Sequence, residues 1–457
     1  MGFYANTDQS AAGISHQIVE IAESKGLSLG KCRGQGYDGA RTMSGIYSGV
    51  QKRILAIQPK AVYVHCAAHN LNLVTNDAVC KVQETSSFFT TLEDLYVFFG
   101  HSIRRWDLLK SFTSESEVKL KRLNPTRWAG RLASVMAVKL RFTDVMKALS
   151  QTILLNVNKD EREQAAHLKK RLERIEFVLL LVVMSEVLSA INVASQYLQS
   201  KDAELQLAVI HLSSAKQRLS AYRDQFAEVK QEAAAICAKW GIAATFENKR
   251  VGKVKRHFDE LSEDCRLTHS EDVFRVNVFN VTIDTVTTQL HHRFIAMKQV
   301  VEQFSILNPT TLAETDSQEL LEKATILQHE YENDLSPAFP LQMVCFKESM
   351  RDEIAKLSSV KQLAHMLIVE NTSLSSGFAD VATALLLFLT LPVTVAFAEK
   401  SFSKLKIIKN YLRNSMGQTR LRGLSLLAIE AFRAKSMDLN ELIKQFADMK
   451  SRRIRLD

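Results

Sequence analysis

The chain is 457 residues long, and its 46% hydrophobic and 24% charged residues are ordinary for a soluble globular protein with two or three domains. Its six cysteines are scattered along the sequence, which argues against a disulfide framework and predicts a reducing compartment. The formal net charge is +9, and most of it is local, because residues 399–457 carry 14 Lys and Arg against 6 Asp and Glu. Such a basic surface suits a polyanion such as nucleic acid, and a basic surface that serves only solubility is an equal alternative at this point.

The first region, residues 1–135, alternates between helix-like and strand-like stretches. Apolar residues at helical spacing predict helices over Ser10–Ser24, Met43–Ile57 and Ala67–Val79. Two β-rich runs, "KCRGQGYD" and "AVYVHC", predict short strands between them. Helices and strands in this alternation are typical of a parallel α/β layer.

The second region, residues 136–375, has apolar residues at three- and four-residue spacing almost throughout, and no proline occurs between Pro125 and Pro309. We therefore predict an all-helical domain without a repeat of fixed period. The stretches "NPTTLAETDSQ", from Asn308, and "ENDLSPAFP", from Glu332, contain turn-forming residues and are predicted to be connecting loops.

The third region, residues 376–457, is an apolar segment followed by basic amphipathic helices. Its last helix is predicted to begin at Asp438 as the N-cap residue, with Glu441 three positions later. The apolar stripe of this helix consists of Leu439, Leu442, Ile443, Phe446 and Met449. Such a stripe packs on its own domain or closes a dimer, and both alternatives stay open at this point.

Two apolar runs require comparison with membrane-spanning helices. Val381–Ala398 is uncharged for 18 residues, which reaches the lower length limit, but it contains three threonines and Pro392. We therefore expect a buried core segment and no membrane partner. The run that starts at Phe177 is expected to be shorter, because Ser185 and Glu186 interrupt it.

Asp38 lies in "GQGYDGARTMSG", where the first predicted strand ends. The carboxyl ends of strands in α/β proteins carry functional residues, and the glycines beside Asp38 allow the backbone to approach a ligand closely. A turn built from glycine and aspartate is the more common use of such residues. The glycines do not form a phosphate-binding loop and match a dinucleotide-binding pattern only loosely.

Cys66 and His69 have a spacing compatible with two zinc ligands, but a complete site needs a second pair. The available pairs, both in the helical region, are Cys265 with His269 and His291 with His292. We therefore favour a helix start with a buried cysteine and a hydrogen-bonded histidine. The spacing supports no Ser-His-Asp or Cys-His catalytic arrangement.

Arg127 and Trp128 are adjacent in "LNPTRWAGR". An arginine beside a tryptophan can contact a phosphate and stack on a base. From the residues alone, we favour the alternative of a domain-boundary anchor with Trp128 in the core.

Glu399 lies where the uncharged run becomes a basic helix. On a helical wheel it sits at the edge of an apolar stripe that consists of Val395, Ala398, Phe402, Leu405, Ile408 and Leu412. Its neighbours at i+3 and i+4 are Phe402 and Ser403, so the usual helical pairing of glutamate with lysine is missing. An acid at the edge of a core without a local partner is unusual.

Four stretches in this order resemble the hAT superfamily of transposases: "CRGQGYDGARTMSG", "YVHCAAHNLNL", "LNPTRWAGR" and "LPVTVAFAEKSFSKLKIIKNYLRNSMGQTRLRGLSLLAIE". The first and last are long and specific, and the resemblance spans nearly the whole chain. It implies an α/β plus all-α fold that is mostly helical. The expected parts are a truncated ribonuclease-H-like core over 1–135, an all-helical insertion over 136–375, and the last core helix with a C-terminal dimerisation region over 376–457.

In active members of this superfamily, three acids hold two divalent metal ions, which activate a nucleophile and stabilise the leaving oxygen during strand transfer. By motif, Asp38 matches the second acid and Glu399 the third, which implies that the two carboxylates lie close together. The first acid belongs to a strand upstream of the residues that open this chain. Lys400 and Phe397 stand where the family prefers an arginine and a small residue, and lysine lacks the planar donors of arginine.

The resemblance therefore implies a domesticated, catalytically inactive transposase derivative that forms a homodimer in the nucleus, with the cytoplasm as the alternative. No small-molecule substrate is expected, and no cofactor is expected unless an active form binds Mg or Mn. An active transposase whose N-terminal part is absent from this chain is one alternative, and a helical scaffold without nucleic-acid binding is another.

Three groups of side chains are expected to carry these properties. The expected DNA contacts are Arg127, Trp128, Lys404, Lys406 and Lys409. The expected dimer contacts are Leu421, Leu424, Leu427, Phe432, Leu442 and Phe446. Cys66 and His69 match recurrent family positions for which a structural or DNA-end role is usual.

Overall fold

The structure, a computed structural model, describes residues 2–112, 120–123, 128–200, 203–246, 269–410, 413 and 415–449. The chain forms two compact units that are interleaved in sequence. Unit 1 comprises Met1–Cys32, Ala40–Pro59 and Val395–Asp457, and unit 2 comprises Arg33–Gly39 and Lys60–Thr394. The described part of the chain is mostly helical, as predicted, and the three-domain division expected from the sequence stays a prediction.

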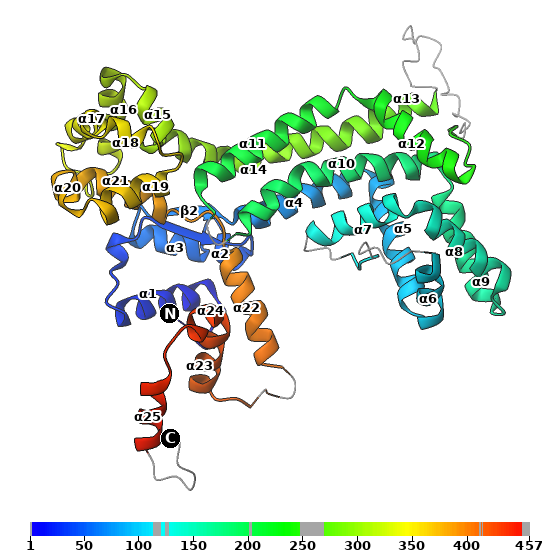
Figure 1. The fold of residues 1–457 in the computed structure, drawn as a ribbon, viewed down its shortest axis with the longest axis horizontal. Coiled ribbons are helices and arrows are strands. Elements are labelled where there is room, and N and C mark those ends of the chain that lie inside the picture. The colour runs from blue at the N-terminus through cyan, green and yellow to red at the C-terminus, as the bar shows by residue number, and fades with distance from the viewer. Residues whose placement is uncertain are drawn as a thin grey trace. The chain divides into compact units, whose positions relative to one another are not determined.

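Unit 1 is built from short helices taken from both ends of the chain (Figure 1). Its elements are α1 (Ala11–Ser24), η1 (Leu29–Lys31), α2 (Arg41–Ser44), α3 (Val50–Ile57), α22 (Ala396–Ile408), α23 (Gln418–Ile429), α24 (Ala431–Lys435) and α25 (Asn440–Asp448). α1 packs against α3, and α22 packs against α23. α1 begins after Ser10, whose side chain accepts a hydrogen bond from the backbone N–H of Gly13.

The first residues of the chain pack on the C-terminal helices of the same unit. The ring of Phe3 meets the ring of Phe402 edge-on, with 5.3 Å between centroids. The side-chain amide of Gln418 donates a 2.8 Å hydrogen bond to the carbonyl of Phe3, and the Arg422 guanidinium lies 5.0 Å from the ring centroid of Tyr4. Unit 1 is therefore held together by contacts between the two ends of the sequence.

The single helix predicted over Met43–Ile57 is wrong, because α2 ends at Ser44 and α3 begins at Val50. Gly45 and Gly49 make the turn between them. A Cβ atom on Gly49 would lie only 2.5 Å from the backbone nitrogen of Gly45. The close backbone approach requires glycine here, and the periodic apolar pattern did not reveal it.

Unit 2 contains the two described strands and most of the helices. Its first elements are β1 (Gly34–Tyr37), β2 (Val62–His65), α4 (Ala67–Lys81), α5 (Gln83–Gly100), α6 (Ile103–Phe112), α7 (Trp128–Leu140), α8 (Phe142–Leu155), α9 (Lys159–Leu172), α10 (Ile175–Leu198), α11 (Leu205–Tyr222) and α12 (Phe226–Trp240). The remaining elements are α13 (Ser270–Phe274), η2 (Arg275–Asn280), α14 (Val281–Gln303), η3 (Ser305–Leu307), α15 (Pro309–Glu314), α16 (Ser317–Glu330), α17 (Phe339–Ser349), α18 (Arg351–Ile354), α19 (Val360–His365), η4 (Met366–Glu370), α20 (Thr372–Gly377) and α21 (Ala379–Thr390).

The two strands pair in parallel, in a register that runs from Gly34 opposite Val62 to Tyr37 opposite His65. The backbone N–H of Cys66 extends the ladder with a 2.9 Å hydrogen bond to the carbonyl of Tyr37. Both strand predictions and their parallel pairing are thereby confirmed. Two strands do not identify a ribonuclease-H-like core, so that part of the fold expectation stays a prediction.

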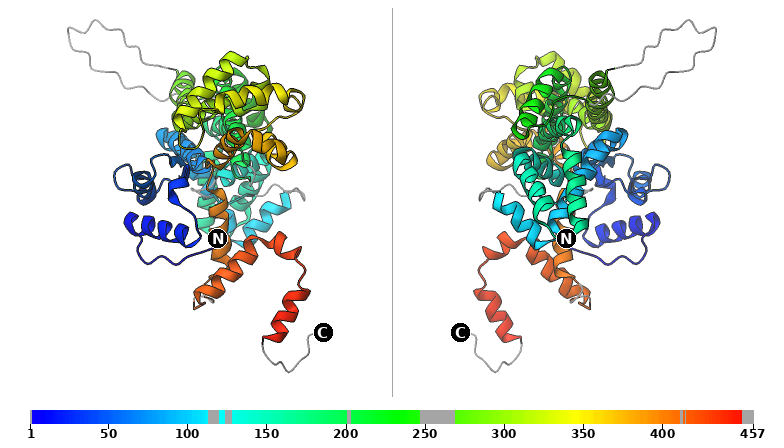
Figure 2. Two further views of the ribbon diagram at one scale, coloured as in Figure 1. Left: turned by 90° about the vertical axis from the view of Figure 1, so that its left-hand side faces the viewer. Right: turned by 90° about the vertical axis from the view of Figure 1, so that its right-hand side faces the viewer.

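The core of unit 2 is a set of long helices around α10 (Figure 1 and Figure 2). α10 packs against α7, α11 and α12, and α14 packs against α4 and α11. Seventeen of the 24 residues of α10 are buried. Ser185 and Glu186 interrupt the apolar run but not the helix, which continues to Leu198, and the Ser185 hydroxyl donates a 2.7 Å hydrogen bond to the carbonyl of Val182. The expectation that this run falls short of a membrane span is therefore wrong by length and composition. By length and composition, α10 is the one helix of the described residues that could span a membrane, and 78% of its most apolar window is buried.

Two further segments test the sequence analysis. The loop expected from Asn308 contains α15 instead, since the Asn308 side chain caps the backbone N–H of Thr310 and Pro309 occupies the first helical turn. The apolar run Val381–Ala398 divides into α21, whose apolar residues are mostly buried, an extended segment from Leu391, and the start of α22. The expected core segment is therefore confirmed for its α21 half.

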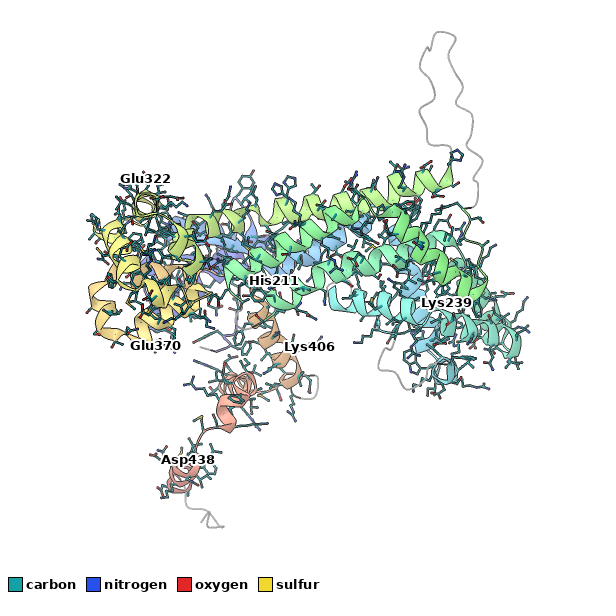
Figure 3. The ribbon with its side chains drawn as sticks, turned by 45° about the horizontal axis from the view of Figure 1, so that its top comes forward. His211, Lys239, Glu322, Glu370, Lys406 and Asp438 are labelled. Atoms are coloured by element: carbon teal, nitrogen blue, oxygen red, sulfur yellow. The ribbon has the colours of Figure 1, made fainter. Side chains whose placement is uncertain are left out.

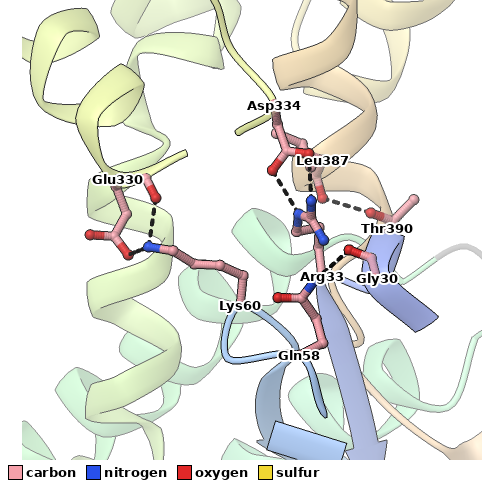
Figure 4. Close-up of polar contacts among 8 residues, drawn as sticks. All are labelled: Gly30, Arg33, Gln58, Lys60, Glu330, Asp334, Leu387 and Thr390. Atoms are coloured by element: carbon pink, nitrogen blue, oxygen red, sulfur yellow. Dashed lines mark hydrogen bonds and ion pairs between the residues drawn. The ribbon is translucent and has the colours of Figure 1, made fainter. Parts of the chain in front are cut away.

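Two ion pairs attach the starts of both strands to the end of α16 and the loop that follows it (Figure 4). The Arg33 guanidinium, one residue before β1, makes two hydrogen bonds of 2.6 and 2.7 Å to the Asp334 carboxylate. Lys60, two residues before β2, lies 2.9 Å from the Glu330 carboxylate. The Arg33 and Asp334 side chains are only 10% and 18% exposed, so this pair is the more buried of the two.

Candidate functional sites

The carboxyl ends of the two parallel strands bring Asp38 and His65 to the same edge of the sheet. Asp38 is exposed and directly follows β1, and His65 is the last residue of β2. The ring of His65 stacks on that of Tyr63, at 6.5 Å between centroids, and on that of His69, at 5.5 Å. The register of the sheet therefore places a carboxylate and two imidazoles in the position where parallel sheets carry functional residues.

His65 has an unusual electrostatic environment. Burial lowers the pKa of its imidazole, nearby His69 and Arg293 lower this pKa further, and Asp38 opposes them. Its Nε2 is buried, and no hydrogen-bond partner for it occurs among the described residues. A Cβ atom on Gly39 would lie 3.1 Å from this nitrogen, so glycine permits the close approach. The imidazole is therefore held neutral near pH 7.

Cys66 and His69 lie at the start of α4. Cys66 occupies the N-cap position, is 1% exposed, and its Sγ lies 3.6 Å from the Thr394 hydroxyl. The predicted helix start with a buried cysteine is confirmed. Within the described residues, no group of three or more His, Cys, Asp and Glu side chains could hold a metal ion, and Cys265 lies outside them. A structural or DNA-end role for Cys66 and His69 stays a prediction.

Glu399 is exposed in the first turn of α22, and its backbone carbonyl accepts a 2.9 Å hydrogen bond from the Ser403 hydroxyl. An acid in the first turn interacts favourably with the helix dipole. Asp38 belongs to unit 2 and Glu399 to unit 1. The expected closeness of the two carboxylates, and with it the metal-binding role of both, stays a prediction.

The expected nucleic-acid contacts differ among themselves. Lys404 donates hydrogen bonds of 2.7 and 3.3 Å to the carbonyls of Ala428 and Ile429 at the end of α23. Lys406 and Lys409 are exposed, and neither forms an ion pair in the described part of the chain (Figure 3 labels Lys406 on α22). Arg127 lies outside the described residues, as does the side chain of Trp128, the first residue of α7.

The expected dimer contacts are mostly exposed in the single chain. Leu421 is the exception, at 5% exposure. The exposed members are Leu424 (37%), Leu427 (58%), Phe432 (90%), Leu442 (59%) and Phe446 (53%). The helix that carries the last two begins at Asn440, one position later than predicted, with Leu439 as its N-cap, and the Asp438 carboxylate accepts a hydrogen bond from the backbone N–H of Asn440 (Asp438 is labelled in Figure 3).

Comparison with known proteins relates both ends of the chain to established families. Residues 373–432 match the hAT family C-terminal dimerisation region, and residues 1–49 match the ZMYM1/FAM200 RNase-like domain. The resemblance to the hAT superfamily is confirmed. The chain is 23% identical over 453 residues to the human "52 kDa repressor of the inhibitor of the protein kinase" and 24% identical over 449 residues to its mouse counterpart. These matches cover 92% of this chain and 56% of each relative, so the chain spans just over half the length of the relatives it matches.

Two features of unit 2 were missed by the sequence reasoning. The Arg33–Asp334 pair joins residues 301 positions apart, and Asp334 lies in a stretch that was predicted only as a loop. Asn70 and Tyr331 line a cavity beside β2, together with Arg293. The sequence signal for the cavity was the presence of polar residues within otherwise apolar helix faces. Such a signal does not show which residues come together in the folded chain.

Proposed function

We propose that this hAT-type chain is a transposase-derived protein that assembles into a homodimer through its C-terminal helices. The observation that carries this proposal is the exposure of large apolar side chains on α23, the following helix and α25. Phe432, which is 90% exposed, lies inside the matched dimerisation region, and Leu442 and Phe446 are exposed on α25, which follows that region in the sequence. Many large apolar side chains exposed near one end of a chain are typical of a protein–protein interface.

The interior of unit 1 offers little support to these helices. In α22 only Ala396 is buried, and in α25 no residue is buried. The stripe on α25 has Leu439, Ile443 and Met449 at 49%, 44% and 82% exposure. A nine-residue helix is marginal in water without packing, so a second copy of the same surface would supply the missing contacts.

Sedimentation velocity over a concentration series tests the dimer. The wild-type protein is expected to be a dimer at micromolar concentration, and the double variant Leu427→Asp/Phe432→Asp is expected to weaken self-association at least about tenfold, because large apolar side chains dominate interface energetics. Ile326→Asp is the matched control, since Ile326 is 66% exposed on α16 in unit 2. A wild-type chain that stays monomeric at tens of micromolar, or a control that dissociates equally, would show that the proposal is wrong.

Weak, sequence-independent DNA binding belongs to the same proposal. It is supported by the net charge of residues 399–457 and by the exposed ammonium groups of Lys406 and Lys409. Fluorescence anisotropy with a short duplex should show affinity that falls steeply with salt. Lys406→Gln/Lys409→Gln should reduce the slope of log affinity against log salt by nearly two, whereas Lys323→Gln/Lys356→Gln in unit 2 should not. A salt-independent signal would exclude phosphate contacts, and nuclear localisation would then lose its physical basis.

Catalytic inactivity of these 457 residues also remains a proposal. The resemblance assigns two-metal chemistry to three acids, of which Asp38 and Glu399 have counterparts here, and Lys400 replaces the preferred arginine. The direct test is a strand-cleavage assay with Mg²⁺ or Mn²⁺. Cleavage that disappears in both Asp38→Asn and Glu399→Gln would establish an active enzyme and overturn inactivity without affecting the dimer.

A further inference from the structure

Unit 2 contains a cavity of about 330 Å³ beside the second strand. It is bounded by β2, α4, α11, α14, the end of α16 and Leu391. Its walls are mostly apolar and include Val62, Val64, Phe294, Met297, Val300 and Leu391. Small-molecule sites in proteins have this character, with apolar walls and a few polar groups, and start at about this volume.

Two almost fully buried polar side chains line this cavity with unused hydrogen-bonding capacity. Asn70 is 6% exposed, and its Oδ1 accepts a long, 3.5 Å hydrogen bond from Arg293. Within the described residues, the amide nitrogen of Asn70 has no hydrogen-bond acceptor. Tyr331 is 5% exposed, and the described part of the chain offers its hydroxyl no hydrogen bond either. Neither polar atom is among the fully buried atoms that lack a partner, so both keep some accessible surface, and a molecule in the cavity can hydrogen-bond to them.

The charges around the cavity are already compensated. Arg293 lies 2.7 Å from the Asp77 carboxylate, and Glu330 lies 2.9 Å from the Lys60 ammonium (Figure 4). His65, another lining residue, is neutral because burial lowers its pKa. A charged ligand would lose its hydration without gaining an unpaired counter-charge. The cavity therefore selects against ions.

We propose that this cavity binds a small, uncharged molecule with an apolar body and one carbonyl group, which accepts hydrogen bonds from the Asn70 amide and the Tyr331 hydroxyl. The volume sets the size of the ligand: an apolar cavity of about 150 Å³ holds benzene, so this one holds a substituted ring or a compact bicyclic molecule. We propose a binding role for this site and no chemical step. It adds a small-molecule ligand to a chain whose sequence predicts none.

Ligand-observed NMR with three probes of similar size tests the chemistry. Acetanilide carries an aromatic ring and a neutral carbonyl, benzoate carries the ring and a charge, and toluene carries the ring alone. Saturable binding of acetanilide to the full chain is expected, with weaker binding of toluene and none of benzoate. Failure of acetanilide to bind up to its solubility limit means that ordered water satisfies the two polar groups and overturns the proposal, as does a preference for benzoate.

Two variants locate the binding. Val300→Phe fills the cavity from α14 and should abolish acetanilide binding, whereas Ile326→Phe on the exposed face of α16 should leave it unchanged. Asn70→Leu removes one donor and should weaken acetanilide roughly three- to tenfold, the effect of one neutral hydrogen bond, without weakening toluene. Melting curves identify any variant that does not fold. Binding that survives in folded Val300→Phe would place the acetanilide elsewhere and show that the cavity is not the site.

Discussion

α10 of unit 2 and α25 of unit 1 are both helices with many apolar residues, but the chain uses them in opposite ways. α10 buries 17 of its 24 residues among α7, α11 and α12. α25 buries none of its nine residues, although its stripe is sharply one-sided. The difference shows that an apolar pattern alone does not determine whether a helix face is buried within its own chain.

The same contrast separates the side chains expected to stabilise the fold from those proposed to mediate self-association. The apolar side chains of α10 contribute to the folding free energy of unit 2, because they leave water when the chain folds. In the single chain Phe432 is 90% exposed and most apolar side chains of α25 are about half exposed, so much of their contribution would become available only on association. Stability and self-association should therefore respond to different substitutions.

The largest expected effect is in α10. Leu181 is fully buried, so Leu181→Ala should lower the free energy of unfolding by about 2–5 kcal/mol through lost burial and the cavity left behind. Leu442→Ala in α25 should change it by no more than about 0.5 kcal/mol at concentrations where the chain is monomeric. Urea unfolding followed by circular dichroism measures both. Equal losses in the free energy of unfolding for Leu181→Ala and Leu442→Ala would mean that α25 packs in the core of its own chain, as α10 does.

The second prediction concerns the ion pair before β1. Asp334→Ala leaves the Arg33 guanidinium, which is 10% exposed, without its carboxylate and should cost about 3 kcal/mol. This value is at the low end for a buried pair, because part of both side chains remains accessible to water. Glu319→Ala, which breaks the exposed pair with Lys323, should cost no more than about 0.5 kcal/mol. Similar losses in urea unfolding would show that burial does not distinguish the two pairs.

Much of the local structure could be predicted from the sequence. The strands that became β1 and β2, and the helices that became α1 and α4, follow from period and composition. The turn between α2 and α3 and the short α15 could not be predicted in this way. The turn depends on the contact of Gly45 with Gly49, and α15 depends on a cap at Asn308 inside a loop-like composition.

The candidate sites show the same limit more strongly. Asp38 could be placed at the carboxyl end of its strand from the sequence, whereas the position of His65 at the same edge emerges from the parallel register of the structure. That Asn70 and Tyr331 line the same cavity depends on the tertiary packing of α4 and of the residue after α16, which no local pattern encodes. Likewise, the basic run after Glu399 predicted a charged surface, but it did not reveal that Lys404 donates a hydrogen bond to a backbone carbonyl at the end of α23.

Lys404 and Lys406 provide a comparison within one helix. Lys404→Met removes the hydrogen bonds to the carbonyls of Ala428 and Ile429 and should lower the free energy of unfolding by about 0.5–1 kcal/mol, since a cation stabilises a helix C-terminus. Lys406→Met should leave unfolding unchanged and weaken DNA binding. Thermal melts and duplex anisotropy on the same two variants separate the roles. A reversed result would assign Lys404 to the nucleic-acid surface.

The smallest expected effect is a pH dependence from His65. Burial places the folded-state pKa of this imidazole below the value of 6.5 for the unfolded chain, so the unfolded state binds more protons as the pH falls through 6.5. The free energy of unfolding of unit 2 should therefore decrease as the pH falls below about 6.5. Above pH 6.5, the protonation of His65 should leave this free energy unchanged. His65→Gln should flatten that decline in urea unfolding measured between pH 5 and pH 8.

Asp38→Asn should make the decline steeper, because Asp38 raises the pKa of His65 and partly offsets the effect of burial. A profile that Asp38→Asn leaves unchanged would mean that the carboxylate does not act on the imidazole, and the sheet edge would then hold two independent groups rather than one coupled site.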